Sequence, residues 1–228
     1  MERIIKAIIF DLDGVIIDSN PEIEKFWHQW AAKTDRRLTL QNITEHIHGR
    51  KGVETLEALF NDISAETKET IIKDAIEFDS RMNPEPIGGI YHFIQQLRAL
   101  KIPLGLVTSS HNTRAQLMLK KQQLENCFEA YVTAEDVTKG KPDPQPYITM
   151  AEKLHYQAEH CLVFEDAISG VLSAKAAGME VIGINAEDAA ERLLACGAVH
   201  VVKSFEELNV QQNKLIVSHA IAYTLQAL

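Results

Sequence analysis

The sequence predicts an α/β fold in which a mostly parallel β-sheet is covered by helices, with an added helical insertion near the N-terminus. Three observations lead to this prediction. Apolar runs of strand length recur along the chain, segments with helical spacing lie between them, and one long stretch after the first run has helical patterns alone. Continuous apolar runs indicate strands buried on both faces. Their alternation with helices predicts a doubly wound, Rossmann-like core of three layers.

The predicted strands are apolar runs that end at polar residues. In chain order they are residues 4–10, 103–107, 130–132, 161–164, 181–184 and 199–202. Helical spacing predicts helices between them at residues 90–100, 114–123, 146–154 and 169–177. The last of these ends before Gly178, a residue that suits a helix C-terminus. Residues 215–228 have apolar residues at mixed spacing, and we expect a final helix packed on the core.

The stretch 20–83 interrupts the alternation, because its patterns predict helices and no strand. The expected helices are residues 22–33, 52–61 and 65–82, and a boundary follows at Pro84, Pro86, Gly88 and Gly89. One helical crossover needs far fewer residues, so we favour an insertion over ordinary crossover packing. We therefore expect a catalytic core of residues 1–17 and 85–228, and a helical cap of residues 18–84.

Composition limits the classes of partner. The 228 residues are 46% hydrophobic and carry a formal net charge of −9, which argues against binding nucleic acid or an anionic membrane. No apolar stretch is long enough to span a membrane, and residues 1–10 lack a signal-peptide pattern. The cysteines have no metal-ligand spacing and are expected to be reduced thiols; they are Cys127, Cys161 and Cys196. We expect a cytoplasmic protein, and a monomer.

Polar residues gather where predicted strands end. They are Asp11 and Asp13, then Thr108 and Ser109, then Glu165 and Asp166. Each pair alone is compatible with an ordinary turn or helix cap. In a parallel sheet, however, these strand ends share one edge, where ligands bind. Carboxylates gathered there without a nearby arginine would repel one another, and a hard cation such as Mg²⁺ resolves that repulsion.

Four segments, in order, resemble the motifs of the haloacid dehalogenase superfamily of phosphotransferases. They are Phe-Asp-Leu-Asp-Gly-Val at 10–15, Leu-Val-Thr-Ser at 106–109, Lys-Gly-Lys-Pro-Asp-Pro at 139–144, and Val-Phe-Glu-Asp-Ala at 163–167 followed by Gly170. The resemblance covers residues 4–204. It implies a Rossmann-like core with a helical cap inserted after the first motif, in agreement with the pattern of predicted elements.

The resemblance also implies roles for the motif residues. Asp11 would attack phosphorus and form a covalent phosphoenzyme. Asp13 would protonate the leaving alcohol and then activate water. Thr108 would hydrogen-bond the phosphoryl oxygens, with backbone N–H groups near Ser109 helping, and Lys141 would offset the developing charge.

The same resemblance implies a Mg²⁺ site and a substrate site. Asp166, the Asp11 carboxylate and the Asp13 carbonyl would hold Mg²⁺, and Glu165 would bind it directly or through water. The candidate substrate-binding residues are Ser109, Asn112, Arg50 and His48. A guanidinium beside a glycine turn suits a phosphate or a hydroxyl-rich substrate, which favours Arg50.

Branches of the superfamily can be distinguished by single residues. Dehalogenases and phosphonatases lack the second aspartate, which is present here as Asp13. β-Phosphoglucomutases carry a histidine on the first cap helix, whereas this chain has Glu22-Ile23-Glu24 there and its first histidine is His28. The segments 25–30 and 46–50 resemble sugar-phosphate and polyol-phosphate phosphatases. Packing within the cap is the alternative explanation for Trp27 and Trp30, and a solvated loop for His46 and His48.

These patterns together predict a Mg²⁺-dependent phosphatase that hydrolyses a small sugar phosphate or polyol phosphate through an aspartyl-phosphate. The alternative enzyme is a β-phosphoglucomutase-like phosphosugar mutase. A third hypothesis, a binding module without catalysis on this fold, is disfavoured because binding alone does not require both Asp11 and Asp13.

Overall fold

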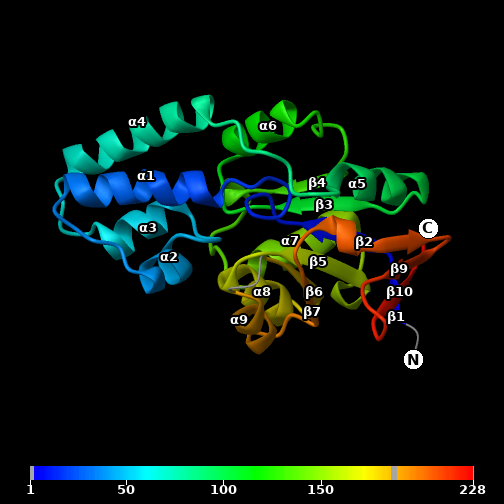
Figure 1. Ribbon diagram of the computed structural model, residues 1–228. Coiled ribbons are helices and arrows are strands. Elements are labelled where there is room, and N and C mark those ends of the chain that lie inside the picture. The colour runs from blue at the N-terminus through cyan, green and yellow to red at the C-terminus, as the bar shows by residue number, and fades with distance from the viewer. Residues whose placement is uncertain (1–2, 186–188, 228) are drawn as a thin grey trace.

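The computed structural model describes residues 3–185 and 189–227, and these ranges have the predicted α/β architecture (Figure 1). Within them, six strands form a parallel sheet in the order β4-β3-β2-β5-β6-β7. Phe10 of β2 pairs with Leu106 of β3 and with Phe164 of β5, so the ends of these strands meet at one edge. The strand bounds are β2 (Ala7–Phe10), β3 (Leu104–Val107), β4 (Ala130–Val132), β5 (Cys161–Glu165), β6 (Glu180–Ile184) and β7 (His200–Val202).

Helices cover both faces of this sheet and make the predicted three layers. Helices α5 (Ile90–Ala99) and α6 (Asn112–Lys121) bury their apolar faces with β2 and β3 in one core cluster. The opposite cluster is formed with α7 (Gln145–Leu154), α8 (Ile168–Ala176) and α9 (Ala190–Ala195). No helix of the described part of the chain combines the length and the apolarity needed to cross a membrane.

The stretch after β2 is helical and lies at the end of the molecule away from both termini (Figure 1). It has a core of its own, in which Trp27 and Trp30 are each only 8% exposed, so the packing explanation for these tryptophans is confirmed. Its second helix was not predicted and begins at a capping box, where the Thr39 hydroxyl accepts from the Asn42 N–H. The helices are α1 (Asn20–Lys33), α2 (Leu40–His46), α3 (Gly52–Leu59) and α4 (Ala65–Arg81).

Two connections join this helical insertion to the sheet, and they are hydrogen-bonded to each other. The Asp18 N–H donates to the Glu85 carbonyl at 2.8 Å, and the Ile87 N–H donates to the Ile16 carbonyl at 3.0 Å. The chain therefore leaves and re-enters the sheet-bearing part through a paired hinge, close to the predicted boundary.

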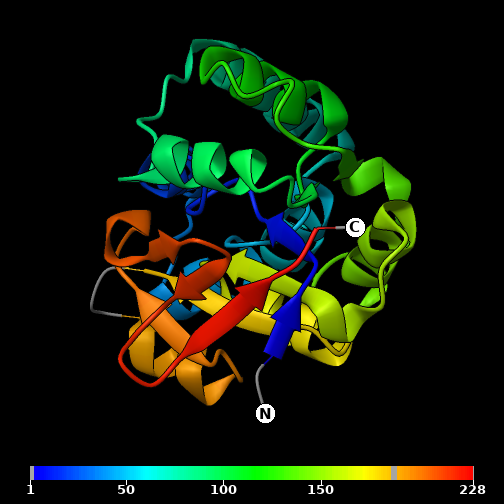
Figure 2. The same cartoon turned by 90° about the vertical axis from the view of Figure 1, so that its right-hand side faces the viewer.

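Two sequence predictions about the ends of the chain are wrong. Residues 4–10 are not one strand, because the strand is interrupted at Lys6. The part before it, β1 (Arg3–Ile5), joins a second sheet beside β10 (Ala222–Leu225) (Figure 2). The expected final helix over 215–228 is instead β9 (Lys214–Ile216) and β10, next to β8 (Asn209–Gln211); Leu228 lies outside the described residues. Buried and more exposed positions alternate along β10, the period of a strand, and β1 provides a partner for it.

Candidate active site

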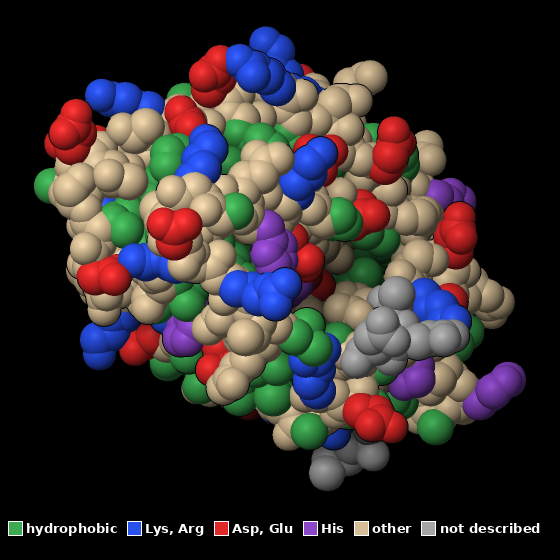
Figure 3. Space-filling view, turned by 60° about the vertical axis from the view of Figure 1, so that its left-hand side comes forward, with side chains coloured by type: hydrophobic (Ala, Val, Ile, Leu, Met, Phe, Trp, Pro, Cys, Tyr) green, Lys and Arg blue, Asp and Glu red, His purple; other side chains and the backbone are tan. Residues whose placement is uncertain are grey.

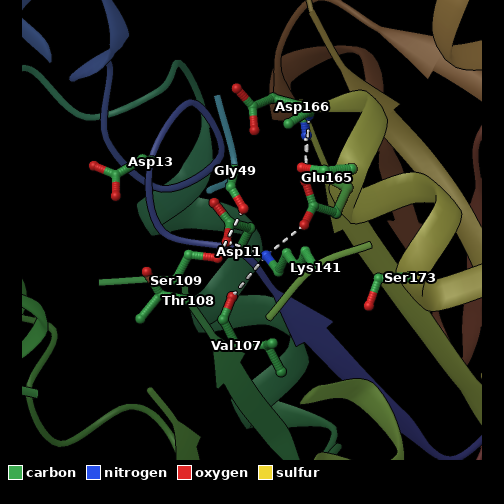
Figure 4. Close-up of polar contacts among 12 residues, drawn as sticks. Asp11, Asp13, Gly49, Val107, Thr108, Ser109, Lys141, Glu165, Asp166 and Ser173 are labelled. Atoms are coloured by element: carbon green, nitrogen blue, oxygen red, sulfur yellow. Dashed lines mark hydrogen bonds and ion pairs between the residues drawn. The ribbon is translucent and has the colours of Figure 1, made fainter. Parts of the chain in front are cut away.

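A buried ammonium lies at the edge where β2, β3 and β5 end (Figure 4). The Lys141 Nζ donates to Asp11 Oδ1 and Glu165 Oε1, each at 2.5 Å, and to the Val107 carbonyl at 3.3 Å. The lysine side chain is 1% exposed. Burial alone would lower the pKa of Lys141, but the two carboxylates outweigh burial and raise it. The ammonium therefore stays charged beside Asp11.

Glu165 keeps Lys141 in place. Its Oε1 also accepts from the Tyr147 hydroxyl at 2.7 Å, and its Oε2 accepts from the N–H groups of Asp166 and Ala167. Gly170 makes room for this carboxylate, since a Cβ there would lie 1.8 Å from Oε1. Four donors bind its two oxygens, so the main role of Glu165 is to hold the Lys141 side chain in position.

Asp166 links this edge to the helical insertion. Its Oδ2 accepts from the side-chain amide of Asn20, the first residue of α1, at 2.6 Å. Gly14 has φ +76° and packs so closely that a Cβ would lie 2.0 Å from the same oxygen. The left-handed backbone conformation and the lack of room for a Cβ therefore both require glycine at position 14.

The carboxylates of this edge fit a divalent cation. Asp11, Glu165 and Asp166 each offer an oxygen, and these atoms lie within 4.8 Å of one another. Burial raises the pKa of Asp11 to about 8, against the lowering effect of Lys141, and burial also raises the pKa of Asp166. A hard cation with oxygen ligands would stabilise the ionised forms. Because Glu165 already accepts from four donors, Asp11 and Asp166 are the better ligands.

Thr108 and Ser109 lie beside Asp11, as predicted, at the end of β3 (Figure 4). Thr108 is buried, and its Oγ1 accepts from the Ser110 N–H at 3.1 Å. The Ser109 hydroxyl donates to the Gly49 carbonyl at 2.7 Å, and Ser169 donates to the His48 carbonyl at 3.2 Å. The loop after α2 is thus held directly over the strand ends.

Asp13 points away from the Asp11 group (Figure 4). It is paired with an arginine, Arg114, that sequence reasoning missed. Arg114 donates to both oxygens of Asp13, at 2.7 and 2.8 Å, and the hydroxyls of Ser19 and Ser110 add two more donors. Burial would raise the pKa of Asp13, but the Arg114 pair and these hydrogen bonds outweigh it, and the pKa is lowered. The expectation of carboxylates without a nearby arginine is wrong for Asp13.

A cavity of about 590 Å³ opens beside Asp166, between the insertion and the sheet. His48 and Glu24 line it from the insertion, with the His48 Nε2 2.9 Å from the Glu24 Oε1. Arg192 of α9 lines it from the other side. Burial lowers the pKa of His48, against the raising effect of Glu24. In the space-filling view a hollow bordered by acidic, basic and histidine side chains lies on this face (Figure 3).

Three of the four predicted substrate-binding residues lie elsewhere, and Ser109, beside Asp11, is one of them (Figure 4). Arg50 is not among the residues that line the cavity. It donates to the Lys141 carbonyl at 2.6 Å and pairs with Glu54. Asn112 begins α6 on the surface, where its N–H donates to Glu135 at 3.1 Å. The structure therefore brings His48 to the cavity, but not Ser109, Arg50 or Asn112.

Comparison with known proteins identifies a family whose model covers all of these strand ends. The family model described as haloacid dehalogenase-like hydrolase matches residues 8–184, well over half of the chain. This chain belongs to that family. The match contains all four motifs, so the resemblance noted in the sequence is confirmed, and with it the prediction of an enzyme.

Curated relatives of this hydrolase align over most of its length. Hexitol phosphatase A of Escherichia coli (strain K12) is 33% identical over 90% of this chain and 94% of its own length. The phosphorylated carbohydrates phosphatase of Thermotoga maritima is 34% identical over 92% of this chain and 100% of its own length. The β-phosphoglucomutase of Bacillus subtilis (strain 168) is 33% identical over 78% of this chain and 83% of its own length.

Proposed function

We propose that this hydrolase is a phosphatase that cleaves a sugar phosphate or polyol phosphate through an aspartyl-phosphate on Asp11. The observation that carries the proposal is the buried Asp11 carboxylate, which lies against the Lys141 ammonium and within reach of Asp166. The names of the hexitol and carbohydrate phosphatases among its relatives support the substrate class.

Each proposed step uses a residue of this edge. Asp11 attacks phosphorus, and the bond from phosphorus to the alcohol oxygen breaks. Asp13, which takes up a proton when it leaves its pair with Arg114, gives that proton to the alcohol oxygen. It later takes one from the water that attacks the phosphoenzyme, which releases phosphate and restores Asp11. Lys141 and the Thr108 hydroxyl stabilise the charge on the transferring group.

We further propose Mg²⁺ as the divalent cation, held by the carboxylates of Asp11 and Asp166 and by the Asp13 carbonyl. Its oxygen ligands and small size support the choice, and it would neutralise charge on the phosphoryl group. Glu165 remains a predicted ligand, although its four hydrogen-bond donors support a role in holding Lys141.

The substrate beyond its phosphate would occupy the cavity beside Asp166. We infer that His48, paired with Glu24, contacts the substrate hydroxyls there. The binding roles of Ser109, Arg50 and Asn112 stay predictions. The contact of Arg50 with the Lys141 carbonyl supports a role in holding the lysine loop.

The wider organisation is also a proposal. We infer that residues 18–84 act as a cap over a core formed by residues 1–17 and 85–228, which the paired hinge supports. We propose a cytoplasmic monomer that acts on a small molecule and binds no nucleic acid or membrane. The net charge of −9 supports the absence of a nucleic-acid or membrane partner, and the three unpaired cysteines support a reducing compartment.

A phosphosugar mutase is not favoured, although one relative carries that name. The first cap helix has Glu24 on the cavity, and its histidine, His28, is an exposed residue. Incubation with a sugar phosphate separates the two activities: a phosphatase releases inorganic phosphate, whereas a mutase accumulates a sugar bisphosphate.

The experiment that tests the proposed function is phosphate release from a panel of sugar, polyol and nucleotide monophosphates, with Mg²⁺ or with excess chelator. We expect release from a sugar or polyol phosphate with Mg²⁺, almost none in chelator, and recovery when Mg²⁺ is returned. Ca²⁺ should inhibit, because its looser and higher coordination misplaces the nucleophile. Full activity in chelator, or preference for nucleotides alone, would contradict the proposal.

A further inference from the structure

Arg114 joins two carboxylates that belong to different parts of the chain. It lies in the first turns of α6 and its side chain is 12% exposed. Its two terminal nitrogens bind Asp13, while its Nε donates to Asp79 Oδ1 of helix α4 at 2.8 Å. One guanidinium thus bridges the loop after β2 and the last turn of a helix of the insertion.

A second cation on the same side of α6 strengthens this link. Lys121 lies seven positions, about two helical turns, after Arg114. Its Nζ donates to the carbonyls of Asp79, Ser80 and Met82, where α4 ends. A displacement of this end of α4 must therefore act on α6 and on the Arg114 bridge.

We propose that Arg114 is a positioning residue that holds the Asp13 carboxylate away from the Asp11 group and couples its release to helix α4 through Asp79. The inference rests on the proposed function, because the position of Asp13 matters only if it transfers protons.

The hydrogen bonds of Asp13 explain why such a release is needed. Its oxygens accept from Arg114, Ser19 and Ser110, and the carboxylate is turned away from Asp11 (Figure 4). To reach a leaving alcohol it must give up the bidentate pair with Arg114, which is among the stronger hydrogen-bonded pairs. Asp79 competes for the same guanidinium and so weakens the hold of Arg114 on Asp13.

The test compares Asp79→Asn with Asp74→Asn, a matched control on the same helix whose carboxylate faces Lys33. Turnover is measured with glycerol phosphate, whose alcohol needs a proton, and with p-nitrophenyl phosphate, whose leaving group needs little help. For Asp79→Asn we expect kcat with glycerol phosphate to fall about three- to tenfold, with KM unchanged. Turnover of p-nitrophenyl phosphate should stay within about twofold, and Asp74→Asn should leave both substrates unaffected.

Two further variants show whether the effect passes through Arg114 to Asp13. In an Asp13→Asn background, Asp79→Asn should have no further effect on kcat. Arg114→Lys cannot bind two carboxylates as a fork does, so it should also remove the effect of Asp79→Asn. Melting temperatures of all variants verify that they are folded.

The proposal is decided by the ratio of kcat with glycerol phosphate to kcat with p-nitrophenyl phosphate, which we expect to fall in Asp79→Asn. An unchanged or increased ratio in Asp79→Asn, or a fall that persists in the Asp13→Asn background, would overturn it. The proposed function is judged separately, from phosphate release by the wild-type protein.

Discussion

Replacing Asp11 with asparagine should lower phosphate release by a factor on the order of 10⁴ to 10⁶, the range seen when a nucleophile is removed. The carboxamide keeps the size of the side chain but cannot form an acyl phosphate. Steady-state kinetics with the best substrate of the panel measure the loss. Asp13→Asn provides the comparison, since loss of a general acid and base should cost roughly 10²–10⁴ and leave substrate binding nearly intact.

The same Asp11→Asn variant should be more stable than the wild type in chelator. Burial raises the pKa of Asp11 from 3.8 to about 8 in the folded protein. Between about pH 4 and pH 8 the folded state therefore holds a proton that the unfolded state has released, so this group opposes folding increasingly as pH rises. Asparagine removes that opposition, and the Lys141 ammonium keeps the Glu165 carboxylate as its partner. Urea unfolding at several pH values measures it, and a variant that is both active and less stable would contradict the assignment.

Replacing Lys141 with methionine is expected to have the next largest effect, on both activity and stability. Asp11 and Glu165 would lose the ammonium that both carboxylates contact. Breaking a buried ion pair on one side costs about 3–5 kcal/mol, because the remaining charge is left without a partner. Loss of a positive group beside the transferring phosphoryl should lower kcat by roughly 10²–10³. Chemical denaturation and kinetics measure the two effects.

Lys139→Met is the matched control for this prediction. Lys139 lies two residues earlier in the same loop, and its side chain is 74% exposed. Its pair with Asp143 should contribute less than about 1 kcal/mol, so stability and kcat should stay close to those of the wild type. If Lys141→Met behaved like Lys139→Met, Lys141 would have no part in charge stabilisation.

The central strands could be predicted because their burial on both faces leaves a continuous apolar pattern. Residues 130–132 were predicted with the observed bounds, and β2, β3, β5 and β6 differ by at most a few residues at either end. The C-terminal strands gave no such signal. Each has only three or four residues, and β10 depends on pairing with β1 from the other end of the chain. A pattern confined to neighbouring residues cannot reveal that pairing.

The site residues that follow strands could be predicted from the sequence, whereas those that come from helices could not. Asp11, Thr108, Glu165 and Asp166 follow predicted strands, so the topology alone brings them together. Arg114, Asn20 and Tyr147 reach the site from helices, where an arginine, an asparagine or a tyrosine is unremarkable in sequence. Only the packing of these helices shows what their side chains contact. Arg50 illustrates the converse, because a suitable residue type beside a glycine turn is directed to the Lys141 carbonyl instead.

The most direct test of the central claim is mass spectrometry of the protein quenched in acid within the first turnover of a sugar or polyol phosphate. We expect one phosphoryl group on the peptide that contains Asp11, and none on the Asp11→Asn variant. With p-nitrophenyl phosphate, whose leaving group needs little protonation, Asp13→Asn should accumulate the phosphorylated form, because the water that removes the phosphoryl group would lack its base. A wild-type protein that releases phosphate without ever carrying a phosphoryl group on Asp11, or that carries it on another residue, would contradict the proposed mechanism.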